Sequence, residues 1–193
     1  MNELTITSIC QLLESKGSTR MPSGIVSLLD HALQSASLAE RAGASNPLVC
    51  ACLLHDIGHV LDEHPAAGTP DAARPRRGHG ARASACLDKL FGPAVVDPIR
   101  LHVDAKRYLC YAHPGYALGL SADARRSLEV QGGAFSPDQA RTFMQEPHAV
   151  DAVNLRLWDD QAHVIGATTP TLSHYAVLLR TCVLPKGTLQ ASE

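Results

Sequence analysis

The chain has 193 residues, of which 45% are hydrophobic and 19% charged, so it is long enough for one domain with a real core but short for two. A net charge of -2 and an isoelectric point near 6.5 give no field that would draw it to nucleic acid or to an anionic membrane. No apolar run approaches a membrane span, and "MNELTITSIC" lacks the basic start of a signal peptide. The six cysteines form no CxxC pair, which favours a reduced, cytoplasmic location.

The first predicted helix lies in "GIVSLLDHALQSASLAERAGA", where apolar residues recur at helical spacing: Ile25, Leu28, Leu29, Ala32, Leu33 and Ala36. Gly43 is placed to end this helix as a left-handed cap. Asn46 and Pro47 are expected to be the N-cap and first position of the next helix. That helix carries "LVCACLLHDIGHV" in one piece.

Residues 65–78, "PAAGTPDAARPRRG", predict a mobile loop. The later helices are expected from His79 to Leu90, from Pro93 through "VVDPIRLHVDAKRYL", over "SADARRSLEV", and over 136–146, 147–163 and 171–183. Pro98 can kink the second of these, Gly132 and Gly133 close the third, and the polar C-terminal tail is expected to fray. The pattern predicts an all-α helical bundle that forms a single domain over residues 1–193.

Histidine is the outlier of the composition, with ten residues against three Phe and four Tyr. Four histidines fall on separate predicted helices or at their edges, and two carboxylates accompany them: His31, His55, His79 and His102, with Asp56 and Asp159. Transition metals bind imidazole nitrogen and carboxylate oxygen, and helix bundles supply such ligands from facing helices. Each residue alone is more often a core, surface or helix-end residue. Their joint arrangement favours a metal centre.

The adjacent pair His55 and Asp56 raises a geometric question. Neighbouring helical residues project about 100° apart, so both can reach one site only near the end of the helix axis. Asp56 could then also bridge to a second metal.

The histidine, the His-Asp pair and the late aspartate follow an order that resembles the HD-domain superfamily of metal-dependent phosphohydrolases: His31, His55-Asp56 and Asp159. The two further histidines, His79 and His102, are similar to the subset with a dinuclear site. Within that subset the chain resembles the mixed-valence di-iron oxygenases that cleave organophosphonates. The likeness rests on "LLDHALQSASLAERAGA", "CLLHDIGH", "HVDAKRYL", "LSADARRSLEVQGG" and "LRLWDD".

The resemblance implies two irons in an Fe(II)/Fe(III) state, with O2 as co-substrate. The first iron would be held by His31, His55, Asp56 and Asp159, and the second by His79 and His102, with Asp56 bridging the two. The resemblance also implies that His59 and Lys106 bind the phosphonate and serve in catalysis.

The helical spacing agrees with this implied anion site. His102 and Lys106 are i and i+4, as are His55 and His59, so each pair is expected on one helical face. This spacing puts a cation or donor one turn beyond a ligand, where an anion bound to iron would need it. The alternatives are a solvated lysine and an exposed histidine pair. Gln131 either lines the site or closes a helix.

Two departures from the resemblance bear on the substrate. Relatives acting on 2-amino-1-hydroxyethylphosphonate carry a Tyr and a Glu that align with Met21 and Gly24, and Gly24 has no side chain to meet an ammonium. Ala124 stands where relatives often place a Ser that helps to hold the phosphonate. The predicted substrate is a small anionic 1-hydroxyalkylphosphonate with a small or uncharged tail, hydroxymethylphosphonate being one candidate. Its cleavage would give phosphate and a carboxylic acid.

Several points stay open at this stage. The arginines around His79 either attract a dianion or form a solvated loop: Arg74, Arg76, Arg77 and Arg82. The same ligands could serve a hydrolase that activates water against a phosphate ester or nucleotide, and a degenerate site could bind a nucleotide or effector. The sequence gives no role to His64, His113, His148, His163 or His174. It does not define the oligomeric state, nor whether the loop at 65–78 closes over the site.

Overall fold

The computed structural model describes residues 4–18, 26–61 and 79–185, except for the side chains of 79–82. Within these ranges the chain is helical, with an isolated bridge between Phe91 and Val183 and no strand, so the predicted all-α class is confirmed. The helices are α1 (Ile6–Lys16), α2 (Leu28–Arg41), α3 (Asn46–Leu54), α4 (Gly58–Leu61), α5 (His79–Leu87), α6 (Pro93–Ala112), α7 (Tyr116–Gly119), α8 (Ala122–Val130), α9 (Pro137–Gln145), α10 (Ala149–Gln161) and α11 (Leu172–Thr181). None of these described helices is long and apolar enough to cross a bilayer.

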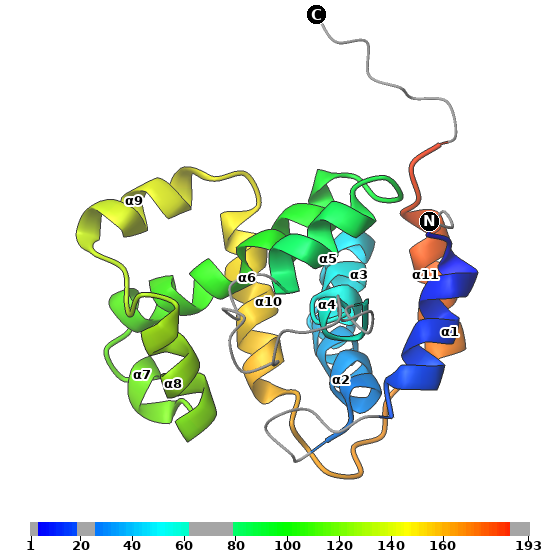
Figure 1. The fold of residues 1–193 in the computed structure, drawn as a ribbon, viewed down its shortest axis with the longest axis horizontal. Coiled ribbons are helices and arrows are strands. Elements are labelled where there is room, and N and C mark those ends of the chain that lie inside the picture. The colour runs from blue at the N-terminus through cyan, green and yellow to red at the C-terminus, as the bar shows by residue number, and fades with distance from the viewer. Residues whose placement is uncertain (1–3, 19–25, 62–78, 186–193) are drawn as a thin grey trace, which may run out of the picture.

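The helices are arranged around α3, α6 and α10 (Figure 1). α6 packs against α10, α5 and α3, and α2 packs against α3 and α10. α1 and α11 lie together at one end of the molecule, and α7, α8 and α9 lie at the opposite end (Figure 1). The candidate ligands lie on α2, α5, α6 and α10 and in the turn after α3.

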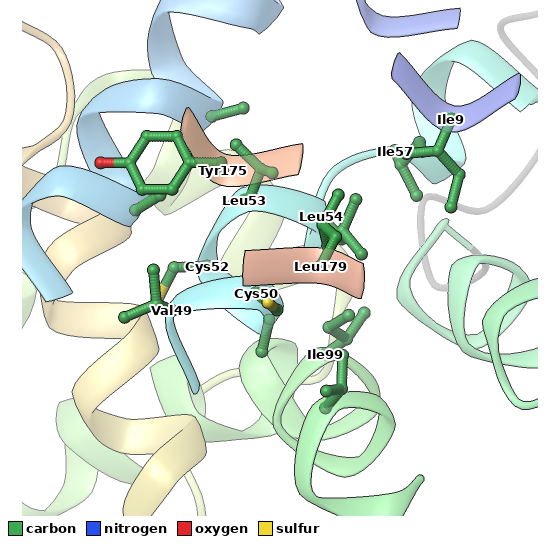
Figure 2. Close-up of a cluster of buried hydrophobic side chains, with 14 of the residues drawn as sticks. Ile9, Val49, Cys50, Cys52, Leu53, Leu54, Ile57, Ile99, Tyr175 and Leu179 are labelled. Carbon is green, nitrogen blue, oxygen red and sulfur yellow. The ribbon is translucent and has the colours of Figure 1, made fainter. Parts of the chain in front are cut away.

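The main core surrounds α3, which is apolar on every side and buried from Leu48 to Leu54. Ile9 of α1, Ile99 of α6 and Leu179 of α11 pack into this core from three directions (Figure 2). A second, smaller core joins α6, α9 and α10 through Leu101, Ala105, Phe135, Ala140, Phe143, Ala149 and Ala152. The predicted ligands His31, His55 and Asp159 lie on or directly after helices that contribute to the main core.

The helix predicted to carry "LVCACLLHDIGHV" in one piece is interrupted, so that prediction is wrong. α3 ends at Leu54 and α4 begins at Gly58, because the chain tightens into bonds between residues three apart. The amide of Ile57 donates to the carbonyl of Leu54 at 3.1 Å, and the amide of His59 donates to that of Asp56 at 3.0 Å. His55 and His59 therefore do not share one helical face.

Other predicted boundaries agree with the structure to within a few residues. Gly43 has a φ of 74°, and Gly132 and Gly133 have φ values of 101° and 73°, as left-handed caps after α2 and α8 require. Ser45 is the N-cap of α3, one residue before the predicted Asn46. α6 continues through Pro98. α1 is a helix that the sequence analysis does not predict.

Some predictions fall outside the described residues. These are the loop at 65–78, the tail beyond residue 185, the whole of Met21, Gly24, His64, Arg74, Arg76 and Arg77, and the side chains of His79 and Arg82.

Candidate metal centre

Four of the predicted ligands converge in the structure. His31 comes from α2, His55 and Asp56 from the turn after α3, and Asp159 from the last turn of α10. His31 Nε2 lies 3.2 Å from His55 Nε2 and 3.1 Å from Asp159 Oδ1. His55 Nε2 lies 3.6 Å from both Asp159 Oδ1 and Asp56 Oδ2. All four residues are buried.

Hydrogen bonds to backbone carbonyls orient the histidine rings. His31 Nδ1 lies 2.9 Å from the carbonyl oxygen of Ala162, the residue that follows α10. His55 Nδ1 lies 2.8 Å from that of Cys52, and His102 Nδ1 lies 2.6 Å from that of Ile99. Because a carbonyl only accepts, Nδ1 carries the proton in each ring, and Nε2 is the nitrogen suited to bind a metal.

This donor set fits a transition-metal ion. Bonds of about 2.0–2.2 Å, as imidazole and carboxylate ligands make to zinc, put neighbouring ligand atoms about 3–3.6 Å apart. The contacts of Asp159 Oδ1 with His31 and His55, at 3.1 and 3.6 Å, match that spacing. Asp56 presents Oδ2 to the two histidines, and its Oδ1 lies 3.7 Å from His59 Nε2. Its two oxygens thus face different neighbours, as a bridging carboxylate requires.

The electrostatics of the cluster favour a cation. Burial alone would lower the pKa of His55, but the charges of Asp56 and Asp159 raise it to about 9. Burial would raise the pKa of Asp159, yet Arg156 and the two histidines hold it well below its usual range. The carboxylate charge that keeps a proton on His55 would also attract a metal ion, and metal binding displaces that proton.

The second predicted pair of ligands is placed only in part. His102 of α6 is buried, and its ring centroid lies 5.6 Å from that of His55. His79 begins α5, which packs on α6 and α4. The structure therefore brings His102 to the edge of the cluster and packs α5 against α6 and α4.

Lys106 is buried, so the alternative of a solvated lysine is wrong. Its Nζ donates to Ser127 Oγ of α8 at 3.2 Å. Burial, followed by the charge of Arg156, lowers the pKa of Lys106 to about 8, although Asp159 and Asp160 act in the opposite direction. A buried amine thus lies near enough to the cluster for the charge of Asp159 to act on it.

His59 and Gln131 occupy different environments. His59 is exposed and lies beside Asp56. Gln131 is buried, and its Oε1 has no hydrogen-bond partner among the described residues. A buried amide oxygen in that state costs free energy unless a ligand or water meets it. Gln131 also caps α8, so the two alternatives for this residue are both compatible with its position.

A cavity of about 410 Å³ lies beside the cluster, between α7–α8 and α10. Its lining residues are Gly115, Tyr116, Gly119, Leu120, Ser121, Ala124, Arg156, Leu157, Asp160, Gln161 and His163. Arg156 connects this cavity to the cluster, because its Nη1 lies 2.7 Å from Asp159 Oδ2. Ala124 adds only a methyl group to the wall, which leaves room where a longer side chain would reach inward.

Four residues near the cluster were not predicted from the sequence: Tyr116, Ser127, Arg156 and His163. The ring of His163 stacks on that of His31 with centroids 4.7 Å apart, and His163, His31 and Asp159 form a second group with metal-binding geometry. Arg156 precedes Asp159 by three residues on α10, a helical spacing that could have indicated this ion pair.

The remaining described histidines lie away from the cluster. His148 pairs with Asp151, and His174 pairs with Glu40. His113 is exposed at the C-terminal end of α6.

A model of the HD domain family matches residues 28–130, which is more than half of the chain and includes five of the six predicted ligands. The chain belongs to the HD domain family. The resemblance found in the sequence is thereby confirmed, and the helical arrangement around the His-Asp pair is that of an HD domain.

Two relatives of this HD-domain chain are named phosphonate dioxygenases. The chain is 39% identical over 179 residues to the hydroxymethylphosphonate dioxygenase of Gimesia maris, covering 92% of this chain and 88% of that protein. It is 31% identical over 158 residues to the glycine-betaine-forming 1-hydroxy-2-(trimethylamino)ethylphosphonate dioxygenase of Leisingera caerulea, covering 82% of this chain and 80% of that protein. Both relatives are oxidoreductases that act on a phosphonate with a hydroxyl on the carbon attached to phosphorus.

Proposed function

We propose that this protein is a di-iron oxygenase that cleaves the carbon–phosphorus bond of a 1-hydroxyalkylphosphonate with O2. Two features found together support the proposal. The chain aligns along 92% of its length with a hydroxymethylphosphonate dioxygenase, and it gathers two imidazoles and two carboxylates into one buried cluster. The proposed chemistry needs such a ligand set, and the distances between the ligand atoms support it.

We propose hydroxymethylphosphonate as the substrate. The reaction balances as hydroxymethylphosphonic acid plus O2 giving formic acid plus phosphoric acid. The sequence supports a substrate without a cationic tail, because Gly24 offers no carboxylate to an ammonium. The relative that acts on a trimethylamino compound is the less similar of the two, at 31% identity against 39%.

We assign the metal ligands as two sets that share Asp56. The first ion would be held by His31, His55, Asp56 and Asp159, and the second by Asp56, His79 and His102. A bound Fe(II)/Fe(III) pair would supply the redox chemistry that activates O2. The protein's part is to hold the substrate beside this pair and to keep its surroundings dry and charged.

Lys106 is the proposed contact for the phosphonate. Its ammonium is buried, its direction is fixed by the bond to Ser127 Oγ, and it lies one helical turn beyond His102. Hydrogen bonds between charged groups are the stronger kind, and burial reduces their competition with water. His59, beside Asp56, is the proposed group for holding a proton at the other side of the substrate.

The wider assignments are proposals of the same kind. Residues 1–193 would form a single HD-type domain, since the helices that carry the ligands share one core. The reduced cysteines and the mild net charge are consistent with a cytoplasmic enzyme whose partner is a small anion rather than nucleic acid or membrane.

The experiment is a comparison of substrates and atmospheres with the iron-loaded protein. We expect hydroxymethylphosphonate to release phosphate and formate in equal amounts, with one O2 consumed for each, and no release under argon. We expect 2-amino-1-hydroxyethylphosphonate to react more slowly. Faster reaction of the amino compound would contradict the substrate assignment. Equal phosphate release without O2, from this substrate or from a phosphate ester, would indicate a hydrolase instead.

A further inference from the structure

The two oxygens of Asp159 have different environments. Oδ1 faces the cluster, 3.1 Å from His31 Nε2 and 3.6 Å from His55 Nε2. Oδ2 faces away and lies 2.7 Å from Arg156 Nη1. A carboxylate beside a metal can bind through one oxygen or through both. Here a guanidinium occupies the second oxygen and leaves the first for the metal.

Arg156 is itself fixed by two other side chains. Its Nε lies 3.2 Å from Asp160 Oδ2 and 3.2 Å from the Tyr116 hydroxyl, and its Nη2 forms an ion pair with Asp160 Oδ1. The Tyr116 hydroxyl donates to Asp160 Oδ2, which closes the triangle. The guanidinium is therefore held by a paired contact with Asp160 on one edge and by Asp159 on another. A planar guanidinium bound in this way has little freedom to turn.

We propose that Asp160 and Tyr116 are positioning residues that hold Arg156 so that Asp159 binds metal through Oδ1 alone. The inference rests on the metal centre of the proposed function. Partners of metal ligands fix the direction and donor strength of those ligands, and their loss typically weakens metal binding by about 10–100-fold. Asp160 and Tyr116 act one step further out, through Arg156.

The position of Tyr116 in the fold shows which parts of the molecule this hydrogen-bond network connects. Tyr116 lies on α7, 44 residues before Asp160 in the chain, and α7 has no buried residue. Tyr116, Arg156 and Asp160 also line the cavity beside the cluster. The hydroxyl of Tyr116 thus ties the wall of this cavity to a metal ligand by two successive contacts.

The test uses Co(II), which binds nitrogen and oxygen ligands and reports its coordination by visible absorption. Asp160→Asn keeps the size of the side chain but removes its charge, and Tyr116→Phe removes only the hydroxyl. Asp138→Asn and Tyr111→Phe are the matched controls, since Asp138 and Tyr111 are exposed and lie on α9 and near the end of α6.

We expect Asp160→Asn to weaken Co(II) binding by about 10–100-fold and Tyr116→Phe by a smaller factor, with changed absorption bands in both. Infrared difference spectra should show the carboxylate stretches of the Co(II)-loaded protein moving toward those of a two-oxygen ligand. The controls should match the parent protein. The thermal unfolding temperature of the metal-free variants should stay near that of the parent, which a purely structural role would not give.

Parent-like affinity and spectra in both folded variants would overturn the inference while leaving the metal centre in place. Failure of the parent protein to bind Co(II) or Fe(II) would overturn the metal centre and this inference together. Should Asp160→Asn fail to fold, Tyr116→Phe decides the matter alone.

Discussion

The cluster of ligands and the wall formed by α7 and α8 are built in different ways. His31, His55 and Asp159 come from segments that pack on the main core around α3, and backbone carbonyls orient the two imidazoles. α7 and α8 have no buried residue, and their side chains Tyr116 and Ser127 make polar contacts with Asp160 and Lys106. The difference indicates that the metal site is fixed by the fold, whereas the wall beside it can change with little loss of stability.

The largest effect should follow removal of a ligand. His55→Ala takes one imidazole from the cluster and removes one charge partner from each of two buried carboxylates, Asp56 and Asp159. We expect loss of bound iron and a fall in kcat/KM well beyond the about 10–100-fold that loss of an outer partner costs. Iron analysis and steady-state kinetics measure both. His174→Ala, which removes an exposed histidine paired with Glu40, is the control and should keep its iron.

The next largest effect should be a difference between α3 and α8 in how much a buried or partly buried leucine contributes to the free energy of unfolding. Leu54 is fully buried at the end of α3, so Leu54→Ala should cost about 2–5 kcal/mol in the free energy of unfolding. Leu128 on α8 is only partly buried, and Leu128→Ala should cost less than about 1 kcal/mol. Urea unfolding of the metal-free proteins measures both. Similar losses for the two variants would show that α8 is part of the core after all.

Lys106→Met tests the substrate side of the comparison. A hydrogen bond from a charged donor contributes about 1.5–3 kcal/mol, so its removal should lower kcat/KM for the phosphonate about 10–150-fold. The change should appear mainly in KM, and the iron content should stay unchanged. Lys89 is exposed near the end of α5, and Lys89→Met is the matched control. A loss of iron in Lys106→Met would place this lysine with the metal site rather than with the substrate.

The pH dependence should show the smallest effect. Burial lowers the pKa of Lys106 to about 8, so this side chain is charged below that pH and neutral above it. We expect kcat/KM to fall as the pH rises past about 8, and a bound metal cation would move the fall to lower pH. Lys106→Arg keeps its charge in this range and should shift the fall upward. An unchanged pH profile in Lys106→Arg would assign the fall to another group.

The residue types of the cluster could be predicted from the sequence because metal chemistry accepts few alternatives. His31, the His55-Asp56 pair and Asp159 are distant in sequence, but their order on helical segments resembles one family, and the structure brings them together. The buried state of Lys106 could not be predicted, because its partner Ser127 lies 21 residues away in the sequence on another helix.

The break after Leu54 could not be predicted from an apolar run that continues on both sides of it. It arises from turn hydrogen bonds such as that of Ile57 to Leu54, which no side-chain pattern specifies. The break also answers how His55 and Asp56 reach one site, since both lie in a turn rather than on a helical face. α1, by contrast, carries clear signals, because Thr5 caps it with Ser8 and its apolar residues are spaced for one face: Ile6, Ile9 and Leu13.

The hydrogen-bond networks around the ligands could not be predicted, because their members lie far apart in the sequence. The Tyr116 hydroxyl meets Asp160 across 44 residues, and the carbonyl of Ala162 meets His31 across 131. Contacts of this kind follow from how helices pack, so single-sequence patterns rarely indicate them.

The most direct test of the account is anomalous diffraction from crystals of the iron-loaded protein, measured on both sides of the iron absorption edge. The proposed di-iron centre predicts two iron peaks, one enclosed by His31, His55, Asp56 and Asp159, and the other by Asp56, His79 and His102. A structure in which iron occupies neither position, or binds at a place that these six side chains do not reach, would contradict it.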